Sequence, residues 1–146
     1  MNDRKANVVL GIAISLIMAL ALAVVFVANK PATPRDPSSP EGAAQAYLKA
    51  VVASDYTKAI THLDPASTCK VADLDNSYFA KDVRINLVDS SQTATDATVK
   101  ISVEIPSGAP IEGYYSEEHT LRLTRSDAGW LITGMPWPMY SCGMVK

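Results

Sequence analysis

The residues best suited to chemistry lie within one short stretch, from Tyr115 to His119. Tyr115, Glu117 and His119 occupy alternate positions, so in a β-strand all three side chains would project from one face. A phenol, a carboxylate and an imidazole that face one cavity can transfer protons as general acid and base. The alternative is a strand end at which these groups are solvated or hydrogen-bonded, which is the commoner arrangement. The stretch therefore supplies candidates, and no catalytic residue is assigned.

The rest of the sequence lacks the usual signatures of a catalytic or cofactor-binding site. His62 and His119 are its two histidines, and neither has the short spacing of metal ligands. His62 is expected to close a helix, where an imidazole near the negative helix end is favourable. The sequence contains no glycine-rich phosphate loop and no Gly-x-Ser-x-Gly motif. We therefore expect no metal and no cofactor, and the sequence favours a protein that is not an enzyme.

Cys69 and Cys142 are the two cysteines of the chain. In a small exported domain such a pair is typical of a disulfide, whereas in the cytosol it more often stays reduced. A bond between them would close a long loop, which on the chain-entropy model stabilises the fold by about 4 kcal/mol. The cysteine pair thus predicts a disulfide-bonded domain outside the cytoplasm.

An apolar stretch from Val8 to Ala28 contains no charge and no proline. As a helix, its roughly 21 residues would extend about 31 Å, which matches a hydrocarbon core about 30 Å thick. It is longer than the apolar part of a cleaved signal peptide, and no cysteine follows it for lipid attachment. We therefore expect an uncleaved, single-pass transmembrane helix at residues 8–28. Basic residues flank it almost equally, so the cysteine pair decides the expected orientation, with residues 1–7 in the cytoplasm.

Small residues recur every four positions within this stretch, at Gly11, Ser15, Ala19 and Ala23. The spacing places them along one stripe of a helix, where the backbone of another helix can approach closely. Membrane helices are rich in small residues in any case, so the stripe is a candidate contact and no more. The proline-rich residues 29–40 then form an extended spacer between the bilayer and a domain at residues 41–146.

The domain begins with helical periodicity and ends with strand periodicity. Helices are predicted over Pro40–Val52, Tyr56–Leu63 and, as a shorter turn, Ala72–Phe79. Strands are predicted over Val83–Leu87, Ala97–Ile105, Tyr115–Thr124 and Trp130–Met135, with turns at residues 90–92 and 126–129. Residues 136–140 contain two prolines and are expected to wrap an edge of the sheet. This order predicts an α+β domain in which two or three helices pack on one face of a curved, four-stranded antiparallel sheet.

Two stretches of this plan resemble a known family. The opening SPEGAAQAYLKAVVASDYTKAITHL is similar to the first two helices of the nuclear transport factor 2-like superfamily, and residues 127–132 resemble its Asp-x-Gly-Trp-x-Ile ending. The resemblance covers most of residues 39–136 and implies a cone of helices against a bent sheet. Small membrane-anchored versions with a proline-rich linker look most like those of actinobacteria. Because this fold hosts enzymes, binding modules and interaction domains, the resemblance implies no particular function and no site residue.

Three functions are compatible with this organisation. The first is a non-enzymatic accessory module that docks on a larger membrane or envelope complex. Trp137 and Tyr140 are a candidate aromatic interface for it, and the commoner alternative is that they cover the domain's own core. The second is a domain that binds a small molecule in a cavity lined by aromatic residues: Tyr47, Tyr78, Tyr115 and Trp130. The third is an isomerase- or dehydratase-type enzyme that uses His119.

The charge of the domain narrows the expected partners. From Glu41 to Lys146 the sequence has about 13 acidic residues and about 9 Lys and Arg residues. This excess of negative charge argues against a nucleic-acid partner. The expected partners are the lipid bilayer and either a membrane protein or a second copy of the chain, and a small-molecule ligand stays open. Because catalytic motifs are missing, the accessory module is the preferred function.

Overall fold

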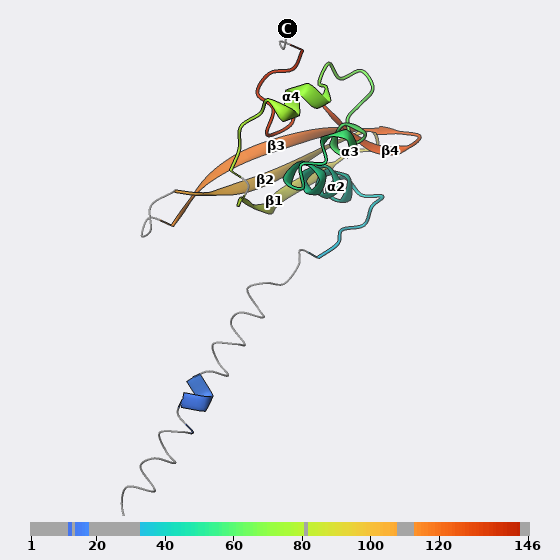
Figure 1. Cartoon of the computed structure of the whole chain (residues 1–146). Helices are drawn as coiled ribbons and strands as arrows, with labels where there is room; N and C mark the ends of the chain where they lie inside the picture. Colours follow the sequence, from blue (N-terminus) through green and yellow to red (C-terminus); the bar gives the residue numbers. More distant parts are fainter. Residues whose placement is uncertain (1–11, 13, 18–32, 81, 108–112, 144–146) are drawn as a thin grey trace, which may run out of the picture. The chain divides into compact units, whose positions relative to one another are not determined.

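The chain forms two compact units, Met1–Pro34 and Arg35–Lys146. The computed structural model describes residues 12, 14–17, 33–80, 82–107 and 113–143 (Figure 1). The predicted transmembrane helix at residues 8–28 lies largely outside this set, and its described residues, 12 and 14–17, are helical. Among the described residues, no helix is long and apolar enough to cross a membrane. The anchor therefore stays a prediction.

Two helices open the second unit, and side-chain caps explain where each begins. Helix α2 (Pro40–Val52) starts at Ser39, whose hydroxyl accepts a 3.0 Å hydrogen bond from the Gly42 amide. Helix α3 (Tyr56–Ile60) starts at Asp55, whose carboxylate accepts a 3.2 Å hydrogen bond from the Lys58 amide. Both starting points agree with the sequence pattern.

Helix α3 ends earlier than predicted because residues 62–64 leave it to pair with strand β4 (Gly129–Thr133). The Ile132 amide donates to the His62 carbonyl oxygen at 2.9 Å, and the Asp64 amide donates to the Ile132 carbonyl oxygen at 2.8 Å. These bonds satisfy backbone groups on the outer edge of β4 that would otherwise be open.

The third helix is shorter than the sequence predicts. Helix α4 (Val71–Asp75) replaces the predicted helix Ala72–Phe79. Beyond it, Phe79 packs edge-on against the Trp137 ring with a centroid distance of 5.3 Å, and Tyr78 turns almost fully into solvent. Phe79 therefore packs against Trp137, which is distant in the sequence, and does not continue the helix.

The strands form a single antiparallel sheet in the order β1-β2-β3-β4, as the sequence predicts. The remaining strands are β1 (Arg84–Gln92), β2 (Asp96–Pro106) and β3 (Tyr114–Ser126). Ser126 and Gly129 close the predicted turn between β3 and β4, where Gly129 has a φ of 113°. A positive φ of this kind favours glycine, which explains why the turn signal was readable from sequence.

The predicted turn at residues 90–92 is wrong, since β1 continues to Gln92. A register shift between Leu87 and Asp89 marks a β-bulge opposite β2. The bulge interrupts the alternation on which the prediction depended, so the predicted strand stopped at Leu87. The turn lies instead at residues 93–95, where the Thr93 amide donates to the Asp96 carbonyl oxygen at 2.7 Å.

The core lies between the helices and one face of the sheet, the face on which Figure 1 shows α2 and α3. Buried residues alternate with exposed ones along the central strands, and the strands contribute Ala97, Val99, Ile101, Val103, Leu121, Leu123, Trp130 and Ile132. Helix α2 adds Ala43, Ala44, Tyr47, Leu48 and Val51. The predicted α+β arrangement on a four-stranded antiparallel sheet is therefore confirmed.

Residues 136–139 enter the core instead of wrapping an edge of the sheet, and Tyr140 is exposed. Trp137 is only 5% exposed, and Pro136, Pro138 and Met139 are buried with it. The Tyr47 hydroxyl donates a 3.0 Å hydrogen bond to the Trp137 carbonyl oxygen. Burial raises the pKa of the Tyr47 phenol, so this group stays a protonated donor.

Two contacts hold the end of this C-terminal stretch against helix α4. The predicted disulfide between Cys69 and Cys142 is present, with the two α-carbons 4.6 Å apart. Beside it, the buried Asp73 carboxylate accepts hydrogen bonds from the Gly143 amide at 3.2 Å and from the Lys70 amide at 2.7 Å. One carboxylate therefore caps α4 and also fixes the C-terminal stretch.

Candidate functional site

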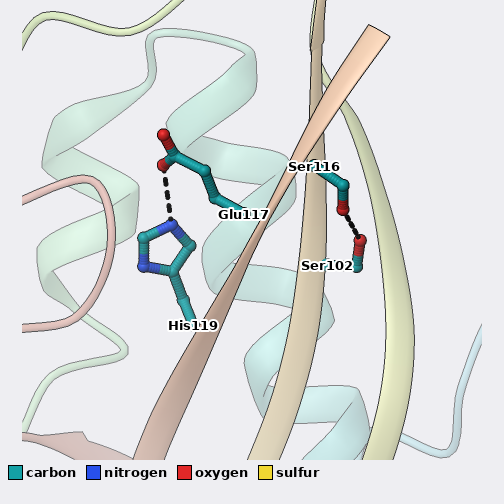
Figure 2. Close-up of polar contacts among 4 residues, drawn as sticks. All are labelled: Ser102, Ser116, Glu117 and His119. Atoms are coloured by element: carbon teal, nitrogen blue, oxygen red, sulfur yellow. Dashed lines mark hydrogen bonds and ion pairs between the residues drawn. The ribbon is translucent and has the colours of Figure 1, made fainter.

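The register of the sheet places the three candidate residues on its helix-covered face. Tyr115, Glu117 and His119 pair with Ile105, Val103 and Ile101 of β2, and they share strand parity with the buried Leu121 and Leu123. Figure 2 shows Glu117 and His119 on one side of β3 and Ser116 on the other. The three side chains thus share a face, as their alternation predicts.

Glu117 and His119 form a direct polar contact. The His119 Nε2 atom lies 3.3 Å from the Glu117 Oε2 atom, and the Glu117 side chain remains 41% exposed (Figure 2). The His119 ring also lies 6.1 Å from the Trp137 ring, measured between centroids. The imidazole is therefore held between a carboxylate at the surface and an aromatic ring of the core.

The two residues of the predicted aromatic interface have different environments. Trp137 is buried and belongs to the core, so it is not a surface residue, whereas Tyr140 is 71% exposed. Partial burial, and secondarily the charges of Glu117 and Tyr115, raise the pKa of the Tyr140 phenol. Tyr140 follows Trp137 by three residues, and the Trp137 ring lies 6.1 Å from the His119 ring. We call Tyr115, Glu117, His119 and Tyr140 together the β3 rim, in which the two tyrosines are exposed and Glu117 and His119 are partly buried.

The four aromatic residues predicted to line a small-molecule cavity differ in their exposure to solvent. Tyr47 and Trp130 are buried in the core, while Tyr78 is almost fully exposed. Tyr115 lies in the β3 rim with half of its surface exposed. Trp137 lies against Tyr47 in the core, and the cavity itself stays a prediction.

Neither histidine belongs to a metal centre in the described part of the chain. Among the described residues, no group of three or more His, Cys, Asp and Glu side chains is arranged to hold a metal ion. His62 follows α3 and lies at the β4 edge, where its Nε2 atom is buried without a hydrogen-bond partner. Burial, and secondarily the charge of Lys58, lowers the pKa of His62, which favours the neutral imidazole.

A shallow depression of about 330 Å³ lies at the β1–β2 hairpin, with Arg122 and Thr133 also in its lining. Ser91, Thr93 and Thr98 contribute hydroxyl groups to its wall. Sequence reasoning missed this feature because its residues come from four strands or their ends and form no local motif. It contains none of the predicted site residues.

The small-residue stripe of the predicted anchor is represented by Ser15 alone in the described part of the chain. Gly11, Ala19 and Ala23 lie outside the described residues. Whether the stripe packs against another helix therefore stays a prediction.

Comparison with known proteins yields similarity at the level of structure. No protein-family model matches the chain, and no curated protein matches it significantly. A SEC-C motif containing protein from Rhodopseudomonas palustris is similar with a TM-score of 0.49 and 16% identity, over 68% of this chain and 79% of its own. An NTF2-like transpeptidase from Campylobacter jejuni is similar with a TM-score of 0.44 and 16% identity, over 65% of this chain and 97% of its own. Similarity at this level assigns neither a family nor an activity.

Proposed function

We propose that the chain is a non-enzymatic accessory module, anchored in the cell membrane, whose domain docks on a larger membrane or envelope complex. The observation that carries this proposal is the β3 rim, where the exposed rings of Tyr115 and Tyr140 accompany the half-exposed Glu117 carboxylate. Tyrosines are enriched among the residues that dominate protein interfaces, because they bury a large area and lose little conformational entropy. The rim is therefore the proposed docking surface.

The proposed family is the nuclear transport factor 2-like superfamily, in the small membrane-anchored form that resembles actinobacterial members. Support comes from the order of elements, with helices first and a four-stranded meander after them. The residues that resemble the family's Asp-x-Gly-Trp-x-Ile ending lie at the β3–β4 turn and in β4.

The proposed location of the domain is outside the cytoplasm, with residues 1–7 inside. The apolar stretch Val8–Ala28 supports an anchor by its length. The Cys69–Cys142 disulfide supports an oxidising compartment, since structural disulfides are rare in the cytosol. Gly11, Ser15, Ala19 and Ala23 supply a second proposed contact, with a membrane helix of the partner or of another copy.

The proposal is tested by recovering partners of the full chain from its own membranes with a mild detergent. Tyr115→Ala and Tyr140→Ala each remove a ring of the β3 rim. Tyr114→Ala is the matched control, because Tyr114 is 47% exposed, similar to Tyr115 at 50%, and projects from the opposite face of β3. We expect recovery of the partner to fall about tenfold in the rim variants and to stay at the wild-type level in the control. A wild-type chain that stays monomeric at every protein level contradicts the proposal, as do rim variants that retain the partner.

A second candidate, an acid–base enzyme, is favoured by the contact between Glu117 and His119. A carboxylate at 3.3 Å can orient an imidazole for proton transfer. If the chain is an acid–base enzyme, His119→Gln is expected to abolish its cellular function and to leave recovery of the partner unchanged. Full cellular function of His119→Gln removes this candidate.

A further inference from the structure

We propose that the β3 rim recognises a cation, namely an ammonium or guanidinium group presented by a Lys or Arg side chain of the partner protein. This inference rests on the proposed docking function and adds the chemistry of the group that docks. The two faces of strand β3 carry the same types of residue in different environments.

On the outer face of β3, both the carboxylate and the tyrosine already have cationic partners. Lys100 Nζ lies 2.6 Å from the Glu118 Oε2 atom. The guanidinium of Arg84 lies over the Tyr114 ring, 4.6 Å from its centroid. Both contacts are of kinds that stabilise a cation at a protein surface.

On the inner face, the corresponding groups have no Lys or Arg partner within the described part of the chain. Glu117 has His119 as its ion-pair partner there, and its side chain is 41% exposed. Among the described residues, the cation–π contacts fall on Tyr114 and Trp130, and none falls on Tyr115 or Tyr140. The rim therefore offers a carboxylate and two exposed aromatic rings to a cation from another molecule.

The charge and chemistry of the rim favour a cation over other ligands. A carboxylate accepts several hydrogen bonds and donates none when ionised, so it matches the donors of an ammonium or guanidinium group. Electron-rich faces of tyrosine attract the same groups. An anionic ligand would meet the repulsion of Glu117, and the whole chain has a net charge of −2.

The test is a titration of the full chain in detergent micelles with Nα-acetyl-lysine methylamide, monitored by NMR signals of the rim side chains. The matched neutral probe is Nα-acetyl-norleucine methylamide, which has the same length of aliphatic chain without the ammonium group. We expect saturable shifts of the Tyr115, His119 and Tyr140 signals with the cationic probe and no saturable shifts with the neutral one. Equal responses to the two probes would overturn the inference.

Two isosteric variants give the test its control. Glu117→Gln removes the charge of the rim and is expected to weaken binding of the cationic probe by about tenfold, the loss typical of a charge-assisted contact. Glu118→Gln removes the same charge at the neighbouring position, on the opposite face, and is expected to leave binding within about twofold. Equal weakening by both variants overturns the inference, because it indicates a general effect of charge.

The outcome separates this inference from the proposed function. If Tyr115→Ala and Tyr140→Ala abolish recovery of the partner but the cationic probe does not bind, docking stands and cation recognition is wrong. If the probe binds in a Glu117-dependent way but the rim variants still recover the partner, cation recognition is supported and docking through the rim is wrong.

Discussion

Gly42 lies where the chain that precedes helix α2 passes directly over the helix. A Cβ atom added at this residue would lie 1.9 Å from the Asp36 carbonyl oxygen, a main-chain atom that cannot rotate away. Nearby, the Arg35 amide donates to the Gln45 side chain at 3.0 Å, and the compact unit begins at Arg35 instead of the predicted Glu41. The end of the predicted spacer is therefore packed on the domain.

Replacement of Gly42 by Ala tests this close approach. Helix propensity alone would favour Ala by about 1 kcal/mol. We expect instead a lower free energy of unfolding and faster amide hydrogen exchange at Ser38 and Ser39, because residues 35–39 must move off the helix. The free energy of unfolding is measured by denaturant unfolding. An increase of about 1 kcal/mol in Gly42→Ala would contradict the close approach.

His62 makes the stability of the domain depend on pH. Its pKa in the folded state is lowered from 6.5, first by burial and then by the charge of Lys58. The unfolded chain therefore binds this proton more readily, so stability is complete above pH 6.5 and decreases as the pH falls through the lower folded pKa. In the His62→Gln variant, this decrease in stability at low pH is expected to disappear. Thermal unfolding at a series of pH values measures the effect. Parallel pH profiles for the variant and wild type would show that His62 does not contribute.

At the scale of elements, the disulfide and Asp73 fix the C-terminal stretch to helix α4. Replacement of Cys69 and Cys142 by Ser is expected to lower the free energy of unfolding by about 2–5 kcal/mol. It also frees Trp137 to leave the core, so its fluorescence should shift to longer wavelength in a Trp130→Phe background. Asp73→Asn keeps the disulfide and serves as the control, with a loss of about 1–2 kcal/mol and an unshifted spectrum. An unshifted spectrum without the disulfide would mean that Tyr47 and the core hold the stretch unaided.

Hydrophobic periodicity predicts the bounds of some helices and strands better than those of others. Helix α2 and strand β2 follow their hydrophobic periods closely, since each packs one regular face on the core. Strand β1 was predicted too short because the bulge after Leu87 changes which positions face inward. Helix α4 was predicted too long because Phe79 packs against Trp137, a residue that no local window contains.

For the whole molecule, the predicted orientation in the membrane gives a direct experiment. If the domain lies outside the cytoplasm, a membrane-impermeant thiol reagent should label Cys69 and Cys142 in intact cells after mild reduction. Labelling should be absent without reduction, because the structure pairs both cysteines. Labelling that appears only in lysed cells would place the domain on the cytoplasmic side and overturn the predicted topology.

The candidate site was predictable only in part. The alternation of Tyr115, Glu117 and His119 was enough to place them on one face, because side-chain direction in a strand follows from backbone geometry alone. The separation of Trp137 from Tyr140 was not predictable, since both are aromatic residues in one proline-rich stretch. Burial of Trp137 depends on Tyr47, Phe79 and His119, which come from three distant parts of the chain.

The sequence by itself determined the class of fold, the antiparallel order of the strands and the pairing of the two cysteines. These features follow from local periodicity, turn residues and the number of thiols, each of which acts over short distances or leaves a single choice. Tertiary structure alone decided that Trp137 fills the core and that Lys100 and Arg84 pair with Glu118 and Tyr114 on the outer face of β3. The physical reason is that side-chain packing and ion pairing depend on contacts between residues that are distant in the sequence. Local sequence patterns do not encode these contacts.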